Sequence, residues 1–417
     1  MMQKYIDELC TRLDDINPHV QAFLPEANRH IRLTSQAHDL EYAYPEPSTR
    51  PPLFGVPIGV KDIFHVDGFL TRAGSALPPD LFAGAQGTVV TRLQDAGALI
   101  LGKTVTTEFA YIEPGPTRNP HRLTHTPGGS SSGSAAAVAA GLCPLALGTQ
   151  TVGSVIRPAA YCGVVGFKPS FGRVDRSGVV MISQSLDHVG FFTQDVEGMA
   201  LVASLVCDDW QPVEPAASPV LLVPDGPYLQ QASPEGLTAF EDQLTRLREA
   251  GFTVRRAPML DDIAELAWLH RQLMAAEMAG VHAEWFAQYE ADYRPRTAAL
   301  IRDGQRVDSE TLHTAREKQV ELRERIGAQM TRHEADLICC PSAPGPAPQG
   351  IESTGDPAMN QPWTFAGVPV IGIPVGLSSD GLPLGLQLIA PFGADEKLLA
   401  SAQAYESFFR FPGFAKS

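Results

Sequence analysis

Two clusters of glycine and hydroxyl-bearing residues are the first residues in this sequence whose types and spacing could do chemistry. The stretch GGSSSGS covers residues 128–134 and carries four hydroxyls, and the stretch GTQTVGS ends at Ser154, 24 residues after Ser130. Residues 129–133 formally match the nucleophile elbow G-x-S-x-G, which would select Ser131. A serine nucleophile needs a base, usually a histidine oriented by a carboxylate, and neither cluster contains a histidine. The clusters therefore indicate serine catalysis with a different base.

Lys61 is the candidate for this base. It follows the apolar run GVPIGV, where a charged side chain is unexpected, and one interpretation is a strand-end lysine that extends its amine to water. The other is a buried lysine, because burial disfavours the charged form and leaves a neutral amine that can take a proton. No serine in the sequence has a lysine three residues further on, which excludes the S-x-x-K arrangement. A lysine base must therefore approach the serines from a distant part of the chain.

Together with Lys61, the two clusters resemble the signature of the amidase signature family. The matching motifs are TPGGSSSGSAAAVAAG at 126–141 and ALGTQTVGSVIRPAAYCGVVGFKPS at 146–170, flanked by GVPIGVKD, GTVVTRLQDAGALILGKTVTTEFA and SLDHVG. The resemblance is strong over residues 50–200 and weaker at GVPVIGIPVGLSSDGLPLGLQLIA, residues 367–390. It implies an α/β fold, a single large domain with a central mixed, mostly parallel twisted sheet that helices cover on both faces.

The resemblance also implies a Lys-cisSer-Ser triad. Lys61 would be the base, Ser130 a proton relay preceded by a cis peptide bond, and Ser154 the nucleophile that forms an acyl-enzyme. Ser131, which the elbow pattern selects, would then support substrate binding together with Gly129. The implied reaction is hydrolysis of an amide C–N bond, with neither a metal nor another cofactor.

The loop that precedes the nucleophile forms the oxyanion hole in this resemblance. The donors would be the backbone amides of Thr151, Val152, Gly153 and Ser154. The commonest family pattern here is G-T-D-T-G-G-S-I-R, whereas this chain has Gln150 for the aspartate, Val152 for a glycine, and its arginine one place onward. The β-branched Val152 is expected to restrict the loop backbone to negative φ.

The arginine at this place, Arg157, lies in VIRPA and resembles the malonamidase-like branch of the family, in which it holds the free carboxylate of the substrate. A bidentate guanidinium suits that task. The alternative is an internal ion pair with an acid such as Asp187. Further along, GIESTGDPAMNQPWTFAGVP resembles substrate-pocket loops of bacterial family members, with Asn360 as a polar contact and Trp363 as apolar lining. Phe365 is expected to pack in the core.

Several functions fit these motifs. The first is a hydrolase of small amides, and a variant of it is a hydrolase of carbamates or aryl amides, similar to a urethanase. A second is the amidase subunit of a tRNA-dependent amidotransferase, whose signature is shared. A third is an inactive scaffold that uses the fold only for interaction, and the complete set of Lys61, Ser130 and Ser154 argues against it. The expected partner is a small-molecule amide or carbamate substrate, and the oligomeric state is open, with a homodimer as one expectation.

Composition and residue spacing limit the partners, cell compartment and metal sites that are expected for this protein. The formal net charge is −15 without a basic stripe, which argues against nucleic-acid and anionic-membrane partners. The six cysteines lack metal spacing and are too few for a disulfide framework, so a reducing cytoplasm fits best, and Cys162 is expected to be an inert buried thiol. His121 and His125 have i,i+4 spacing but lie in a proline-bounded loop, so no metal site is expected. No segment reaches the roughly 20 apolar residues of a membrane span.

The elements that must position these residues alternate between short apolar runs and helical patterns from Phe54 onward, the rhythm of βαβ units. An alanine-rich helix is expected at 134–141, and Ser132 and Ser134 are expected to cap its N-terminus. Other helices are expected at 1–23, 237–250 and across most of 262–333. Strands are expected at 144–147, 335–340, 369–374 and 384–389. The expected organisation is one domain, 1–417, comprising a helical segment (1–50), a signature core with the triad (51–206) and a part that completes the sheet and pocket (207–417), with 207–219 as a linker or surface excursion.

Overall fold

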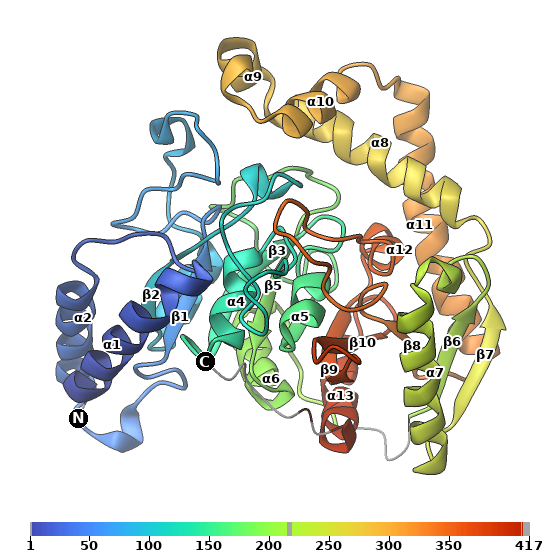
Figure 1. The fold of residues 1–417 in the computed structure, drawn as a ribbon, viewed down its shortest axis with the longest axis horizontal. Helices are drawn as coiled ribbons and strands as arrows, with labels where there is room; N and C mark the ends of the chain where they lie inside the picture. Colours follow the sequence, from blue (N-terminus) through green and yellow to red (C-terminus); the bar gives the residue numbers. More distant parts are fainter. Residues whose placement is uncertain (1, 215–218, 410, 412–417) are drawn as a thin grey trace.

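The computed structural model describes residues 2–214, 219–409 and 411. Strands from most parts of the chain form one sheet. Its strands are β1 (Pro57–Lys61), β2 (Leu99–Thr104), β3 (Leu145–Gln150), β4 (Val165–Lys168), β5 (His188–Thr193), β6 (Leu221–Asp225), β7 (Val254–Pro258), β8 (Leu337–Pro341), β9 (Val370–Leu377) and β10 (Pro383–Ile389). The ten strands lie in the order β2-β1-β3-β5-β4-β9-β10-β8-β6-β7 (Figure 1). Because strands from the signature core and from the C-terminal part share one sheet, the chain is a single large α/β domain, as expected.

Strand direction differs from the expectation. β1 pairs in parallel with β2 and β3, and β6 pairs in parallel with β7 and β8. The five neighbouring pairs between β3 and β8 are antiparallel. The sheet is therefore mixed, as predicted, but the prediction that it is mostly parallel is wrong. Apolar runs indicate where strands occur, and they carry no information on the direction in which neighbouring strands run.

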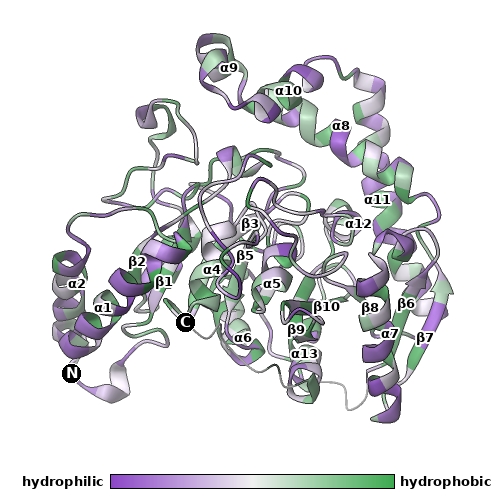
Figure 2. Cartoon of the chain, in the orientation of Figure 1, coloured by the Kyte–Doolittle hydropathy of each residue, from purple (hydrophilic) through white to green (hydrophobic). Residues whose placement is uncertain are grey.

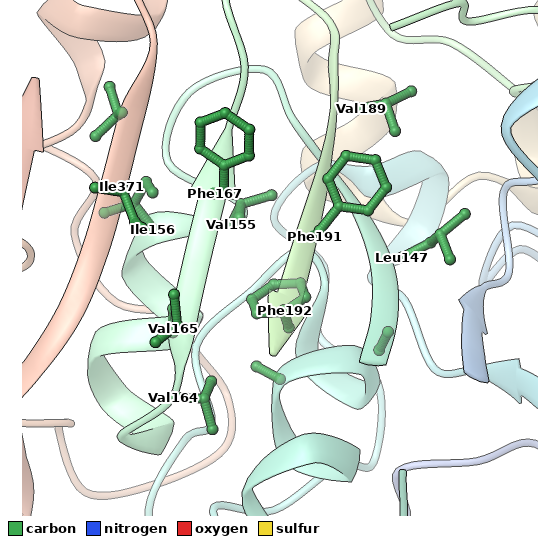
Figure 3. Close-up of a cluster of buried hydrophobic side chains, with 14 of the residues drawn as sticks. Leu147, Val155, Ile156, Val164, Val165, Phe167, Val189, Phe191, Phe192 and Ile371 are labelled. Atoms are coloured by element: carbon green, nitrogen blue, oxygen red, sulfur yellow. The ribbon is translucent and has the colours of Figure 1, made fainter. Parts of the chain in front are cut away.

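The core lies on both faces of the central strands. Every residue of β1 to β5 is buried. Because successive side chains of a strand point to opposite faces, continuous burial means that both faces are covered. Figure 3 shows the centre of this core, where Phe167 of β4 and Phe191 of β5 lie close to Val155 and Ile156, all of them fully buried.

Helices cover the sheet. They are α1 (Met2–Val20), α2 (Arg29–Ala43), α3 (Thr88–Asp95), α4 (Ser132–Ala139), α5 (Ile156–Cys162), α6 (Val196–Val206), α7 (Pro234–Glu249), α8 (Ile263–Val281), α9 (Ala283–Tyr289), α10 (Pro295–Gly304), α11 (Ser309–Arg332), α12 (Gln361–Ala366) and α13 (Asp395–Phe409). α4 and α5 pack on each other and on central strands, whereas α6 packs with α3 and α13. Hydrophilic residues are frequent on α1 and α2 at the edge of the molecule (Figure 2), and α8 to α10 form an arm at the top of Figure 1.

The small side chains of α4 allow this helix to approach neighbouring backbone closely. A Cβ atom on Gly133 would lie 2.3 Å from the carbonyl oxygen of Ala22 and 2.4 Å from the amide nitrogen of Val105, so only glycine fits. The amide of Gly133 donates to the carbonyl of Val105. This contact brings the serine cluster against the segment that follows β2.

Most predicted elements are present with shifted ends. The helices expected at 134–141 and 237–250 are α4 and α7, and the long helical region expected at 262–333 is divided into α8 to α11. Residues 215–218 of the predicted linker or surface excursion lie outside the described residues. Among the described residues, no helix combines the length and hydrophobicity that a membrane crossing requires.

Candidate active site

Lys61 ends β1 inside the protein, and its side chain has no exposed surface. Its amine donates to Oγ of Ser130 and to Oγ1 of Thr149, both at 2.8 Å. Burial holds the pKa of Lys61 well below its ordinary value, and the charge of Asp187 opposes this shift in part. The interpretation of Lys61 as a strand-end lysine that reaches water is therefore wrong, because the strand ends against α4 and β3 instead of at the surface.

Ser130 lies immediately before α4. The peptide bond between Gly129 and Ser130 is cis, as the resemblance predicts. Ser130 is fully buried, and its backbone carbonyl accepts a hydrogen bond from the amide of Thr107 at 3.2 Å. Its hydroxyl accepts from the Lys61 amine, so the structure joins two of the three predicted triad residues directly.

The other hydroxyls of the cluster bind backbone atoms. Ser131 Oγ donates to the carbonyl of Thr149 at 3.2 Å and accepts from its amide at 3.3 Å, which ties it to β3. Ser132 Oγ donates to the carbonyl of Gly128, and Ser134 Oγ to the carbonyl of Leu147. The prediction that Ser132 and Ser134 cap the helix is therefore wrong: Ser131 occupies the N-cap position, and it makes no side-chain cap bond. Carbonyls of the adjacent turn and strand lie within reach of these short side chains and satisfy them instead.

Ser154 lies in the turn between β3 and α5, and it is 6% exposed. Within the described structure its hydroxyl makes no hydrogen bond, and thus none to Ser130. The same holds for the backbone amides of Thr151, Val152, Gly153 and Ser154. Val152 has no positive φ, in line with its β-branched side chain. A free hydroxyl beside free amide donors is what a nucleophile with an oxyanion hole requires.

Gln150, which occupies the position of the usual aspartate, stabilises the turn between β3 and α5 through hydrogen bonds of its side-chain amide. Its Oε1 accepts from the backbone amides of Val155 at 2.8 Å and Ile156 at 3.0 Å. Its Nε2 donates to Oγ1 of Thr364 in α12 at 2.9 Å. A glutamine can do both because it carries an acceptor and a donor, whereas an ionised aspartate carries acceptors only.

Arg157 lies in α5 and is 3% exposed. Its guanidinium donates to the carbonyls of Gly355 at 2.7 Å and Gly129 at 2.6 Å, and to Oγ1 of Thr354 at 3.2 Å. Its Nε has no partner in the described structure. Burial lowers the pKa of Arg157 to about 10, against the opposing influence of Tyr161 and Asp356. Arg157 thus joins the residue before the cis bond to the C-terminal pocket loop.

The alternative ion pair of Arg157 with Asp187 is wrong. The carboxylate of Asp187 accepts hydrogen bonds from other donors: Oγ1 of Thr151 at 2.5 Å and the backbone amides of Ile182 at 2.8 Å and Ser183 at 3.1 Å. Among the described residues, no carboxylate lies within ion-pair distance of the Arg157 guanidinium. The arginine is therefore a buried cation held only by neutral groups.

The predicted pocket residues of the C-terminal part are all buried. Asn360 donates to the carbonyl of Ser342 at 2.8 Å, and its Oδ1 has no partner in the described structure. A Cβ atom on Gly153 would lie 2.6 Å from that Oδ1, so the asparagine reaches the loop 151–154. Trp363 lies in the core and donates to the Tyr228 hydroxyl at 2.9 Å, so its role as pocket lining stays a prediction. Phe365 packs in the core, as predicted.

Sequence reasoning missed Thr149, His270 and Thr364. Thr149 lies within the GTQTVGS stretch and could have been suspected from it, since β1 and β3 are parallel neighbours that end at the same edge. His270 Nε2 donates to the carbonyl of Thr151 at 2.9 Å from α8, and Thr364 Oγ1 donates to the carbonyl of Val152 at 2.6 Å from α12. His270 carries no local sequence signal, whereas Thr364 lies within the motif GIESTGDPAMNQPWTFAGVP and could have been suspected from it.

Other features lie apart from these residues. His121 Nε2 lies 2.8 Å from the carbonyl oxygen of Cys162, and the described part of the chain contains no group of three or more side chains suited to a metal ion. Cys162 is fully buried, and burial raises the pKa of its thiol. A cavity of about 850 Å³ lies between α1 and residues 120–123, and none of the predicted site residues lines it.

Comparison with known proteins places this chain. A sequence model of the family described as Amidase matches residues 4–399. The chain is 31% identical to a glutamyl-tRNA(Gln) amidotransferase subunit of Geobacter metallireducens, over 95% of this chain and 92% of that protein. A crystal structure of an amidase superposes with a TM-score of 0.89 at 29% identity, covering 98% of this chain and 96% of that one. Native peptide amidase from Stenotrophomonas maltophilia superposes with a TM-score of 0.83 at 27% identity, over 100% and 96% of the two chains.

These matches extend over nearly the entire chain and over nearly the full length of each protein compared. The chain therefore belongs to the amidase signature family.

Proposed function

We propose that this protein hydrolyses small amides through an acyl-enzyme on Ser154, with Lys61 as base and Ser130 as relay. The observation that carries the proposal is the Lys61 amine. It is fully buried, its pKa is held well below the ordinary value, and it lies 2.8 Å from the Ser130 hydroxyl. A lysine in this state can take a proton near neutral pH, which an exposed lysine cannot do.

The proposed reaction begins with the neutral amine. Rotation about its Cε–Nζ bond presents the lone pair to the Ser130 hydroxyl, which gives up its proton and takes one from Ser154. Ser154 Oγ then forms a bond to the substrate carbonyl carbon, and the developing oxyanion is stabilised by the amides of the loop 151–154. The C–N bond breaks as the leaving amine takes the proton back from Ser130, and Lys61 reprotonates Ser130. Water, deprotonated through the same relay, then cleaves the acyl-enzyme and releases a carboxylic acid.

The acyl group of the substrate is the finer part of the proposal. Arg157 is a buried guanidinium without a carboxylate partner in the described structure, and its Nε–H is unsatisfied. A buried cation of this kind is stabilised by an anion, and a guanidinium binds a carboxylate strongly. These contacts favour an acidic monoamide such as malonamate, as in the malonamidase-like branch.

The test is release of ammonia or amine from four substrates by the purified chain alone: malonamate, a neutral aliphatic amide, an anilide and an aryl carbamate. The proposal expects turnover of at least one amide, and the acidic preference expects the highest kcat/KM with malonamate. Preference for the carbamate or anilide would move the assignment to a carbamate or aryl-amide hydrolase. Absence of turnover on all four, together with an unreactive Ser154 toward a fluorophosphonate probe, would point to an inactive scaffold.

A second candidate is the amidase component of a tRNA-dependent amidotransferase. It is favoured by the similarity to the glutamyl-tRNA(Gln) amidotransferase subunit of Geobacter metallireducens, which extends over nearly the full length of both chains. A hydrolase should release ammonia without partner proteins. A chain that labels with fluorophosphonate but releases ammonia only with partner proteins and a charged tRNA would establish this second function.

A further inference from the structure

Two side chains from the C-terminal half hold the outer side of the loop that precedes Ser154. His270 Nε2 donates to the carbonyl oxygen of Thr151 at 2.9 Å, and Thr364 Oγ1 donates to the carbonyl oxygen of Val152 at 2.6 Å. His270 and Thr364 are both fully buried. Within the described structure, neither side chain forms a hydrogen bond with Lys61, Ser130 or Ser154.

These two contacts, together with the geometry of a trans peptide, define the direction in which the Val152 and Gly153 amides point. Among the described residues the only non-proline cis bond joins Gly129 and Ser130, so the peptide units that follow Thr151 and Val152 are trans. In a planar trans peptide the C=O and N–H bonds point to opposite sides. The Thr151 carbonyl faces His270, so the Val152 amide faces away from it. By the same geometry, the Gly153 amide faces away from Thr364.

The donors and acceptors at these contacts are consistent with this arrangement. The Thr364 hydroxyl accepts from Gln150 Nε2 at 2.9 Å, and its own proton has two acceptors within reach, the Val152 carbonyl at 2.6 Å and the Asn360 carbonyl at 3.1 Å. The shorter contact is the one to Val152. The ring of His270 stacks on Phe365, with ring centroids 5.5 Å apart, and this contact fixes its orientation. Burial lowers the pKa of His270 to about 4, so near neutral pH the ring is neutral. A carbonyl oxygen only accepts, so the contact with Thr151 requires the tautomer that carries its proton on Nε2.

We propose that His270 and Thr364 are positioning residues that aim the Val152 and Gly153 amides at the substrate oxyanion. This inference rests on the proposed function, because it assigns these amides to the oxyanion hole. His270 lies in α8 and Thr364 lies in α12, so both helices are coupled to the reacting atoms through the loop 151–154. Both act through the loop, and neither touches the substrate.

The kinetic test uses matched variants. Thr364→Val removes the hydroxyl without changing size, Thr364→Ser keeps it, and Thr238→Val removes an exposed hydroxyl that donates to Pro234 in α7. Misdirecting an oxyanion donor affects the transition state more than substrate binding, so Thr364→Val should lower kcat roughly ten- to hundredfold with KM within about twofold. Thr364→Ser should recover most of kcat, and Thr238→Val should match the parent.

His270 is tested in the same way. His270→Phe keeps the ring that stacks on Phe365 but removes the donor, whereas His270→Gln can place an amide N–H near the same position. The Phe variant should lose kcat at nearly constant KM, and the Gln variant should retain more of it. If kcat is unchanged in both Thr364→Val and His270→Phe, or if KM rises as much as kcat falls, the positioning role is overturned.

A structural readout separates this inference from the proposed function. Crystal structures of Thr364→Val and His270→Phe should show the peptide units after Val152 and Thr151 rotated from their present direction. An inactive, unlabelled parent protein would remove the proposed function, and the positions of these peptide units would still show whether the two side chains hold the loop. Peptide units that keep their direction in both variants would overturn the inference even in an active enzyme.

Discussion

Two buried lysines on neighbouring strands have opposite surroundings. Lys61 ends β1, and within the described structure its amine donates to the hydroxyls of Ser130 and Thr149, whereas Lys103 in the adjacent β2 lies 2.8 Å from Oδ1 of Asp62. They are 0% and 4% exposed, and burial lowers the pKa of both. The nearby carboxylate opposes this shift at Lys103, while Lys61 falls well below its ordinary range. The two lysines therefore share burial and differ in whether a carboxylate contacts the amine.

The difference between Lys61 and Lys103 matters for catalysis only if the hydroxyl of Ser130 beside Lys61 takes a proton from the nucleophile Ser154. Ser154→Ala should lose roughly 10⁴- to 10⁶-fold in kcat and all fluorophosphonate labelling, because no other group replaces the attacking oxygen. Ser131→Ala should stay within about tenfold of the parent, because it removes only hydrogen bonds to β3. Measured side by side, equal losses in the two variants would refute the assignment of Ser154.

Exchange of each lysine for arginine should divide the two positions by activity. Lys61→Arg should lower kcat/KM roughly 10²- to 10⁴-fold, since a guanidinium stays protonated and cannot act as a base. Lys103→Arg keeps the cation beside Asp62 and should retain most of the activity. Rates on the best amide substrate decide the matter, and an active Lys61→Arg enzyme would end the proposed base role.

Exchange for methionine should divide the same positions by stability. Lys103→Met leaves the carboxylate of Asp62 buried without its partner, which typically costs about 3 to 5 kcal/mol. Lys61→Met removes a neutral amine and no ion pair, so its cost should be below about 1.5 kcal/mol. Urea unfolding of the two variants supplies both free energies. Similar losses would mean that the two lysines do not differ in charge state.

Arg157 is a buried side chain whose hydrogen-bond acceptors in the described structure are all neutral groups. Arg157→Leu should lower kcat/KM for malonamate roughly ten- to hundredfold more than for a neutral amide, if the guanidinium binds a substrate carboxylate. A purely structural arginine would instead lower the melting temperature and reduce activity toward both substrates in equal proportion. Both substrates and the melting temperature are therefore measured on the one variant.

The pH profile tests the state of Lys61 without any substitution. Because only neutral Lys61 can take the proton, kcat/KM should rise about tenfold per pH unit below its lowered pKa and stay level in mildly alkaline buffer. Lys103→Arg should leave this profile in place. A rate that is constant from acid to alkaline pH would contradict the need for a neutral amine.

The fold could be predicted in kind but not in its connections. The apolar runs indicated the strands that became β3, β8, β9 and β10, and the helical patterns indicated α4 and α7. The antiparallel centre of the sheet was missed, because pairing direction depends on how distant segments meet. The capping of α4 by Ser132 and Ser134 was wrong for a similar reason: carbonyls outside the helix compete for those hydroxyls.

The sequence by itself determined which residues form the candidate triad, because Lys61, Ser130 and Ser154 stand in motifs whose composition and order are specific to one family. Only the tertiary structure decided the surroundings that give those residues their chemistry. It buried Lys61 with no contacting carboxylate among the described residues, placed neutral acceptors around the Arg157 guanidinium, and brought His270 and Thr364 to the loop 151–154. These contacts join segments far apart in the chain, so no local pattern reports them, and a pKa follows from burial and neighbouring charge instead of residue type.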